Sequence, residues 1–152
     1  MSMKKLSIIT FLFCFVLMSC NGLKTAVYDQ YSYQQTTSIK VEVVKLADNA
    51  TESYAKYSLE VKKMLLDMEK MMEYEKNKPN NETTYTMWKL LNDKDKNLVA
   101  GFFKRWEEKE SLSPIFIEES KKQMMEAFDL LIQYEIKKDQ QSKNNLLTLI
   151  SK

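Results

Sequence analysis

The 152-residue chain contains no histidine, and its two cysteines both lie within the first 20 residues. Without histidine, the Ser-His-acid and Cys-His arrangements of many hydrolases lack their base. If Cys14 is removed with a leader and Cys20 is modified, the folded part has no free cysteine, no disulfide and no Cys/His zinc site. The sequence therefore predicts a protein that is not an enzyme and that holds no cofactor or metal.

Glycine and proline are scarce, with two residues of each. Tight hairpins and phosphate-binding loops depend on such residues, so helices are favoured over strands. The fold class expected is all-α, a small bundle of three to four amphipathic helices.

Basic residues give no sign of a nucleic-acid partner. Arg105 is the one arginine, whereas bidentate phosphate or guanine recognition depends on several. Removing Lys4 and Lys5 from the 23 basic residues leaves 21, which equals the 21 acidic residues. A surface with no net charge does not concentrate polyanions through its overall field. We therefore expect no nucleic acid among the partners.

The beginning of the chain has the pattern of a secretory leader. Behind Lys4 and Lys5, residues 6–18 form an apolar run of 13 residues. A membrane-spanning helix needs about 20 residues, whereas the apolar region of a signal peptide needs about 7–15. We predict that residues 1–19 are a signal peptide.

The sequence Leu17-Met18-Ser19-Cys20 resembles the lipobox of bacterial lipoproteins. Leu17 and Ser19 fit it well, and Met18 resembles the relaxed spirochaetal version. The resemblance implies that Cys20 becomes the first residue of the mature protein, diacylated on sulfur and acylated on its amine. Two or three long acyl chains attach a protein to a membrane in effect permanently. The alternative is a cleaved signal that happens to contain a cysteine.

Residues 3–22 also resemble the leaders of the plasmid-encoded outer-surface lipoproteins of Lyme-disease spirochaetes. Among their small helical families, the borrelial orf-D family is the one suspected here. Beyond residue 22 the likeness is general: lysine-rich, histidine-free and glycine-poor helices. The resemblance implies a lipid-anchored protein exposed on the bacterial outer membrane and, for some members, binding of host proteins. No binding residue can be carried over.

Residues 20–38 are predicted to be the lipidated cysteine and a flexible tether, because residues 21–38 are polar and show no helical period. Eighteen flexible residues have a typical reach of about 23 Å. Three tyrosines, Tyr28, Tyr31 and Tyr33, are unusual in a tether. They could pack onto the bundle, sit at a membrane interface or form an exposed aromatic strip.

Residues 39–152 are expected to form the helical bundle domain. Residues 39–47 fit either a strand or a helix, and helix is favoured because a lone strand has no partner. The clearest helix covers 50–76, capped by Asn49 with Glu52 three residues later. Its seam follows a 3–4 spacing, and comprises Tyr54, Tyr57, Val61, Met64, Met68 and Met71.

The second half of the chain adds further helical segments, divided by turns. The chain turns at residues 77–81, and shorter helices are expected over 83–91 and 94–110. Ser113 and Pro114 have the pattern of a cap and a first-turn proline, opening a helix over 114–138 whose seam includes Glu135.

Two functions remain open. One is a surface module that binds a host protein; the other is a periplasm-facing structural or assembly lipoprotein of the envelope. Aromatic side chains dominate interface energetics, so the candidate partner-binding residues are Tyr28, Tyr31 and Tyr33, together with Trp88 or Trp106 if either is exposed. The alternative is that these aromatic residues only pack the bundle.

The lipobox generates a direct prediction. Changing Cys20→Ala should abolish incorporation of radiolabelled palmitate, because the acceptor sulfur is lost, and should leave precursor or soluble protein. Unchanged labelling in this variant would refute the anchor.

Overall fold

The computed structural model describes residues 25–151, so the proposed signal peptide, Leu17, Met18, Ser19 and Cys20 lie outside the described part. Within residues 25–151 the chain forms six α-helices and one short 3₁₀ helix, with no strand. The expected all-α class is confirmed, whereas the expected number of three to four helices is too low. None of these helices is both long enough and apolar enough to cross a membrane.

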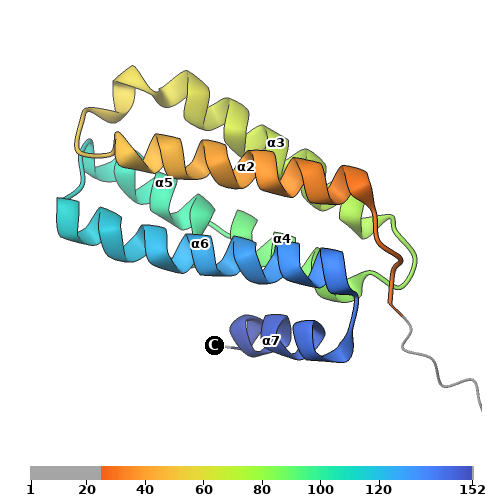
Figure 1. Ribbon diagram of the computed structural model, residues 1–152. Helices are drawn as coiled ribbons and strands as arrows, with labels where there is room; N and C mark the ends of the chain where they lie inside the picture. Colours follow the sequence, from red (N-terminus) through yellow and green to blue (C-terminus); the bar gives the residue numbers. More distant parts are fainter. Residues whose placement is uncertain (1–24, 152) are drawn as a thin grey trace, which may run out of the picture.

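The helices lie side by side along one long axis (Figure 1). α2 packs against α3 and α6, α3 contacts both α4 and α5, and α7 covers α4 and α6. One end of the molecule carries the start of α2, the α3–α4 loop and the α6–α7 junction. The element bounds are α2 (Gln30–Asp48), η1 (Tyr54–Lys56), α3 (Ser58–Lys76), α4 (Glu82–Asn92), α5 (Val99–Lys109), α6 (Pro114–Lys137) and α7 (Gln140–Ile150).

α2 begins at Gln30, so the predicted boundary of the tether at residue 38 is wrong. The Asp29 carboxylate caps the helix by accepting hydrogen bonds from the backbone N–H of Tyr31 at 2.9 Å and of Ser32 at 3.3 Å. The helical interpretation of residues 39–47 is correct. The early part escaped detection because its buried seam starts with two small polar residues, Ser32 and Thr36.

The predicted helix start at residue 50 is also wrong. Asn49 ends α2 rather than opening the next helix, and its side-chain amide donates to the carbonyl of Lys45 at 2.9 Å. The backbone beyond it is bound to distant segments: Leu112 N–H donates to Ala50 O at 2.8 Å, and the Trp106 indole donates to Glu52 O at 2.9 Å. Because these carbonyls serve other partners, the chain turns here and α3 starts eight residues later than expected, at Ser58.

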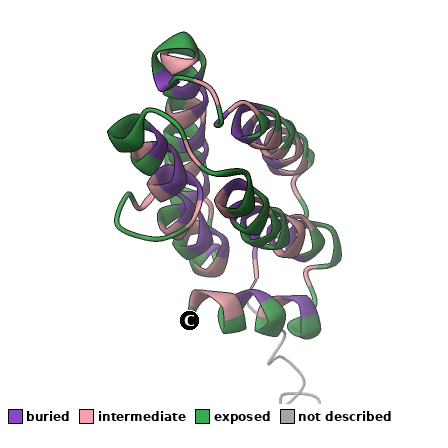
Figure 2. Ribbon diagram, turned by 90° about the vertical axis from the view of Figure 1, so that its left-hand side faces the viewer, coloured by how far each residue is buried: buried purple, intermediate pink, exposed green. Residues whose placement is uncertain are grey.

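The buried sides of the helices face inward around a single core (Figure 2). The predicted methionine seam of α3 is confirmed, since Met64, Met68 and Met71 are at most 2% exposed. Ser113 caps α6 as predicted, accepting a hydrogen bond from Phe116 N–H at 3.3 Å, with Pro114 in the first turn.

Gly101 is required by the turn that precedes α5. α5 begins at Val99, later than the predicted residue 94, because residues 93–98 fold back in a turn. A Cβ atom added to Gly101 would lie 1.8 Å from the carbonyl oxygen of Lys96. The contact is with backbone, which cannot move aside as a flexible side chain would.

Gly101→Ala should therefore destabilise the protein. In an open helix this change stabilises by up to about 1 kcal/mol, whereas overpacking costs about 1–3 kcal/mol. Urea unfolding should show a lower midpoint for Gly101→Ala and little change for Thr86→Ala, an exposed control in α4. A raised midpoint for Gly101→Ala would contradict the contact.

Candidate functional site

Both tryptophans are excluded as surface contacts, because Trp88 and Trp106 are 0% exposed. The Trp106 ring packs edge-on against Tyr54, with centroids 5.5 Å apart, and Trp88 packs in the same manner against Phe128 at 6.2 Å. They were candidates for partner contact only if exposed, and they instead fill the core.

The tyrosines instead gather on the surface at one end of the bundle. Tyr28 and Tyr31 are half exposed, whereas Tyr33 is half buried. The Tyr28 and Tyr33 ring centroids lie 6.5 Å apart, and the Tyr31 ring lies 4.8 Å from that of Tyr74. We call Tyr28, Tyr31, Tyr33 and Tyr74 the tyrosine patch. Sequence reasoning missed Tyr74, and no pattern in α3 distinguishes it from other exposed residues.

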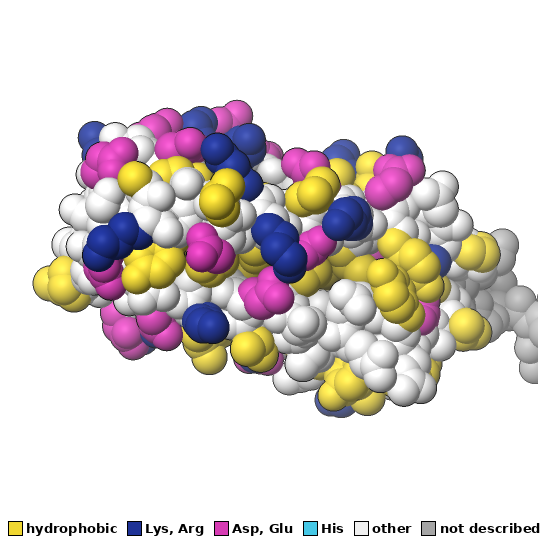
Figure 3. Space-filling model, turned by 90° about the horizontal axis from the view of Figure 1, so that it is seen from above, with side chains coloured by type: hydrophobic (Ala, Val, Ile, Leu, Met, Phe, Trp, Pro, Cys, Tyr) yellow, Lys and Arg dark blue, Asp and Glu magenta, His cyan; other side chains and the backbone are white. Residues whose placement is uncertain are grey.

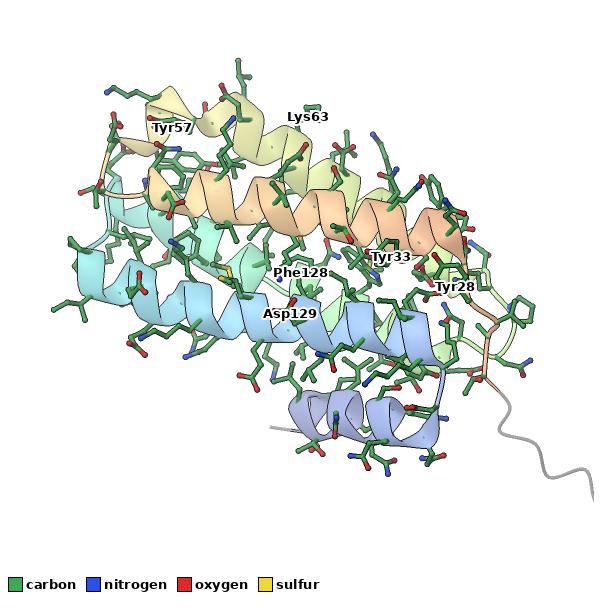
Figure 4. The ribbon with its side chains drawn as sticks, in the orientation of Figure 1. Tyr28, Tyr33, Tyr57, Lys63, Phe128 and Asp129 are labelled. Atoms are coloured by element: carbon green, nitrogen blue, oxygen red, sulfur yellow. The ribbon has the colours of Figure 1, made fainter. Side chains whose placement is uncertain are left out.

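The tyrosine patch lies where the described chain enters the bundle. Tyr28 is at the end of the molecule that carries the start of α2 (Figure 4). Just before it, Ala26 is buried, and its backbone N–H donates to the carbonyl of Asn80 at 2.9 Å. Val27, between the two, is 83% exposed. The bundle is thus bound to the chain from Ala26 onwards.

Two buried glutamates lie beneath the patch. Glu75 of α3 is 0% exposed and Glu135 of α6 is 2% exposed. The Ser32 hydroxyl of α2 donates to the Glu75 carboxylate and lies 3.5 Å from Oε2 of Glu135. The backbone N–H of Asp29 donates to Oε1 of Glu135 at 2.7 Å. Both glutamates therefore hold the start of α2.

Lysines at the ends of the same helices balance these carboxylates. Lys138 Nζ lies 2.7 Å from Glu135 Oε2, and Lys78 Nζ lies 3.2 Å from Asp29 Oδ2 and 3.3 Å from Glu75 Oε2. We call Asp29, Ser32, Glu75, Lys78, Glu135 and Lys138 the ionic cluster. A buried charge is tolerated when it is paired and hydrogen-bonded.

The sequence contained a signal for Glu75 that was not used. The residue continues the α3 seam at the 3–4 spacing, one turn beyond Met71, so its burial follows from the helical period alone. Glu135 was correctly placed on the α6 seam.

Tyr74 connects the patch to the ionic cluster by donating a hydrogen bond to Asp29 Oδ2 at 2.6 Å. This bond, burial and the charge of Asp29 raise the pKa of Tyr74 to about 12. Burial alone would raise the pKa of Asp29, but the hydrogen bonds from Tyr74, Lys78 and the Ser32 backbone outweigh it and lower that pKa below its usual value. Asp29 is therefore held as a carboxylate.

The remaining surface offers less definite chemistry. A groove of about 360 Å³ between α2 and α3 has Leu46 and Tyr57 among its lining, together with Glu42, Lys45 and Lys63. Seen from above, charges of both signs are interspersed over this face (Figure 3). Within residues 25–151, no group of three or more acidic, cysteine or histidine side chains is arranged to hold a metal ion.

Comparisons of the chain with protein-family models, with curated proteins and with solved structures find no match.

Asp29→Asn tests the ionic cluster, since asparagine caps a helix as well as aspartate does but cannot pair with Lys78. The pKa of Asp29 is lower in the folded protein than in the unfolded chain. The ionised carboxylate therefore contributes fully to stability above the unfolded pKa, near 4, and this contribution is lost as the pH falls through the folded pKa. We expect Asp29→Asn to lower the free energy of unfolding by about 1–3 kcal/mol at neutral pH, as measured by urea unfolding.

The difference in the free energy of unfolding between Asp29→Asn and the natural protein should decrease as the pH falls below about 4. Asp95→Asn, an exposed control, should show little difference at any pH. A difference for Asp29→Asn that is equally large in acid would show that the carboxylate charge is not the cause.

Proposed function

We propose that this protein is a lipid-anchored, non-catalytic interaction module that holds a protein partner at the bacterial outer membrane. Its partner is a host protein or another protein of the envelope. The proposal combines the lipobox at Leu17–Cys20 with a rigid helical body.

The observation that supports it is the short join between anchor and bundle. Ala26 is six residues beyond Cys20, and it is already buried and hydrogen-bonded to the bundle. Six residues can extend over at most about 20 Å. A body held so closely keeps the end that carries Ala26 near the membrane, and its opposite end is the more accessible to a partner.

The end of the bundle opposite the tyrosine patch is the better candidate for partner contact. Leu59, at the start of α3, is 78% exposed, and Ile115, at the start of α6, is 80% exposed. Both helices start at this end (Figure 1). A large partner has free access here, whereas the membrane restricts access to Tyr28, Tyr31 and Tyr33.

A pull-down with the unlipidated fragment 21–152, offered envelope and host serum proteins, tests the proposal. We expect specific capture that is lost in the double variant Leu59→Ser/Ile115→Ser, because the exposed apolar contacts are removed. The matched control is Tyr28→Ser/Tyr31→Ser, which changes two half-exposed residues at the other end and should still capture the partner.

No capture by the natural fragment would refute partner binding. Loss of capture in the tyrosine variant alone would move the contact to the tyrosine patch. Protease treatment of intact cells distinguishes the two partner classes, because only a protein displayed on the cell surface is cleaved; full protection would favour an envelope partner on the periplasmic side.

A further inference from the structure

We infer that the tyrosine patch, with Val27, is a membrane-contact surface that seats on the lipid headgroups beside the anchor. The inference rests on the proposed lipidation of Cys20. It adds that the bundle lies against the bilayer in one orientation and does not move freely at the end of the connecting chain.

The bundle lies close to Cys20 along the chain. The chain between Cys20 and Ala26 has a maximum reach of about 20 Å and a typical reach of about 13 Å if flexible. The headgroup region adds about 5–8 Å on each side of the hydrocarbon core. The end of the bundle therefore stays within one side chain's length of the headgroups for much of the time, at a high effective concentration.

The patch exposes side chains of the kind that favour the boundary between a membrane and water. Tyrosine has an apolar ring and a polar hydroxyl, and it is enriched where membranes meet water. Tyr28 and Tyr31 expose half of their surface, Tyr74 exposes 38%, and Val27 exposes 83%. Tyr28, Tyr31 and Tyr33 lie within two helical turns of Ala26, and Tyr74 packs against Tyr31.

Among residues 25–151, the lysines nearest the patch are already paired with carboxylates. Lys70 and Lys76 are paired with Asp67 and Glu73, and Lys78 is paired with Asp29 and Glu75. With these charges balanced, attraction to an anionic surface contributes little. The patch should seat equally well on neutral phosphatidylcholine.

Hydrogen bonds hold the tyrosine patch in place on the bundle. Asp29 accepts hydrogen bonds from the Tyr31 backbone and the Tyr74 hydroxyl, and its own N–H donates to buried Glu135. The patch is therefore fixed to α2, α3 and α6 together. Contact at the patch would orient the whole bundle, which a contact through a loose segment could not do.

Site-directed spin labelling of the full lipidated chain tests this inference. The natural cysteines, Cys14 and Cys20, are respectively removed and acylated in the proposed lipoprotein, so one introduced cysteine carries the label. Val27→Cys reports on the patch without changing a tyrosine. Leu59→Cys, matched in exposure at 78% against 83%, reports on the opposite end. Each protein is reconstituted in phosphatidylcholine vesicles, and again with phosphatidylglycerol added.

We expect the label at position 27 to gain accessibility to dissolved oxygen and lose accessibility to a water-soluble relaxant, in both lipid mixtures, while the label at position 59 remains aqueous. Adding Tyr28→Ser and Tyr31→Ser to Val27→Cys should return the label to water. If the label stays in the headgroups after these changes, the short join alone causes the proximity and the patch is refuted.

The other outcomes are equally decisive. An aqueous label at position 27 in a protein that floats with the vesicles overturns the membrane contact but leaves the proposed anchor and partner function intact. Contact in the phosphatidylglycerol mixture alone overturns its aromatic basis. A protein that fails to float with the vesicles overturns the anchor, and the inference falls with it.

Discussion

The burial of Glu75 and Glu135 is the constraint on which the arrangement of this molecule depends. A carboxylate removed from water must be paired and hydrogen-bonded, and breaking a buried pair by removing one member costs about 3–5 kcal/mol. The partners come from several segments: Ser32 and the Asp29 N–H from the start of α2, Lys78 and Asn81 from the α3–α4 connection, and Lys138 from the end of α6. These segments can satisfy both carboxylates in one mutual arrangement, so the cluster specifies how three helices meet.

The same constraint explains why a polar segment forms a helix. Residues 30–38 have no apolar period, and an isolated helix of such composition is unstable in water. Here Ser32 and Thr36 are buried in a helix that packs against α3 and α6, and the hydroxyl of Ser32 donates a hydrogen bond to the Glu75 carboxylate. Polar burial thus replaces apolar burial over one and a half turns. As a result, the segment from Ala26 onwards, which was expected to act as a tether, is part of the helical body.

Sequence reasoning succeeded where the packing is apolar and local. The α3 methionine seam, the Ser113-Pro114 start of α6 and the all-helical class follow from period and capping, which neighbouring residues determine. It failed where distant groups decide. Asn49 has the pattern of a helix start, yet hydrogen bonds from Leu112 and Trp106 hold the following carbonyls in a turn. Trp88 and Trp106 were candidates for partner contact only if exposed, and they lie instead on the buried sides of their helices.

In the arrangement that we propose, the rigidity of the tyrosine patch also gives the two ends of the bundle different roles. Tyr74 and Tyr31 are in ring contact, and both are bound to Asp29, which is bound in turn to Glu135. A tyrosine patch mounted in this way cannot adapt its shape to a protein surface without disturbing buried charges. A lipid headgroup layer makes no demand for shape complementarity, since it is fluid and adjusts to the rings. The stiffness of the patch therefore matches a fluid surface, and in the proposed arrangement the exposed apolar residues at the opposite end are left for recognition.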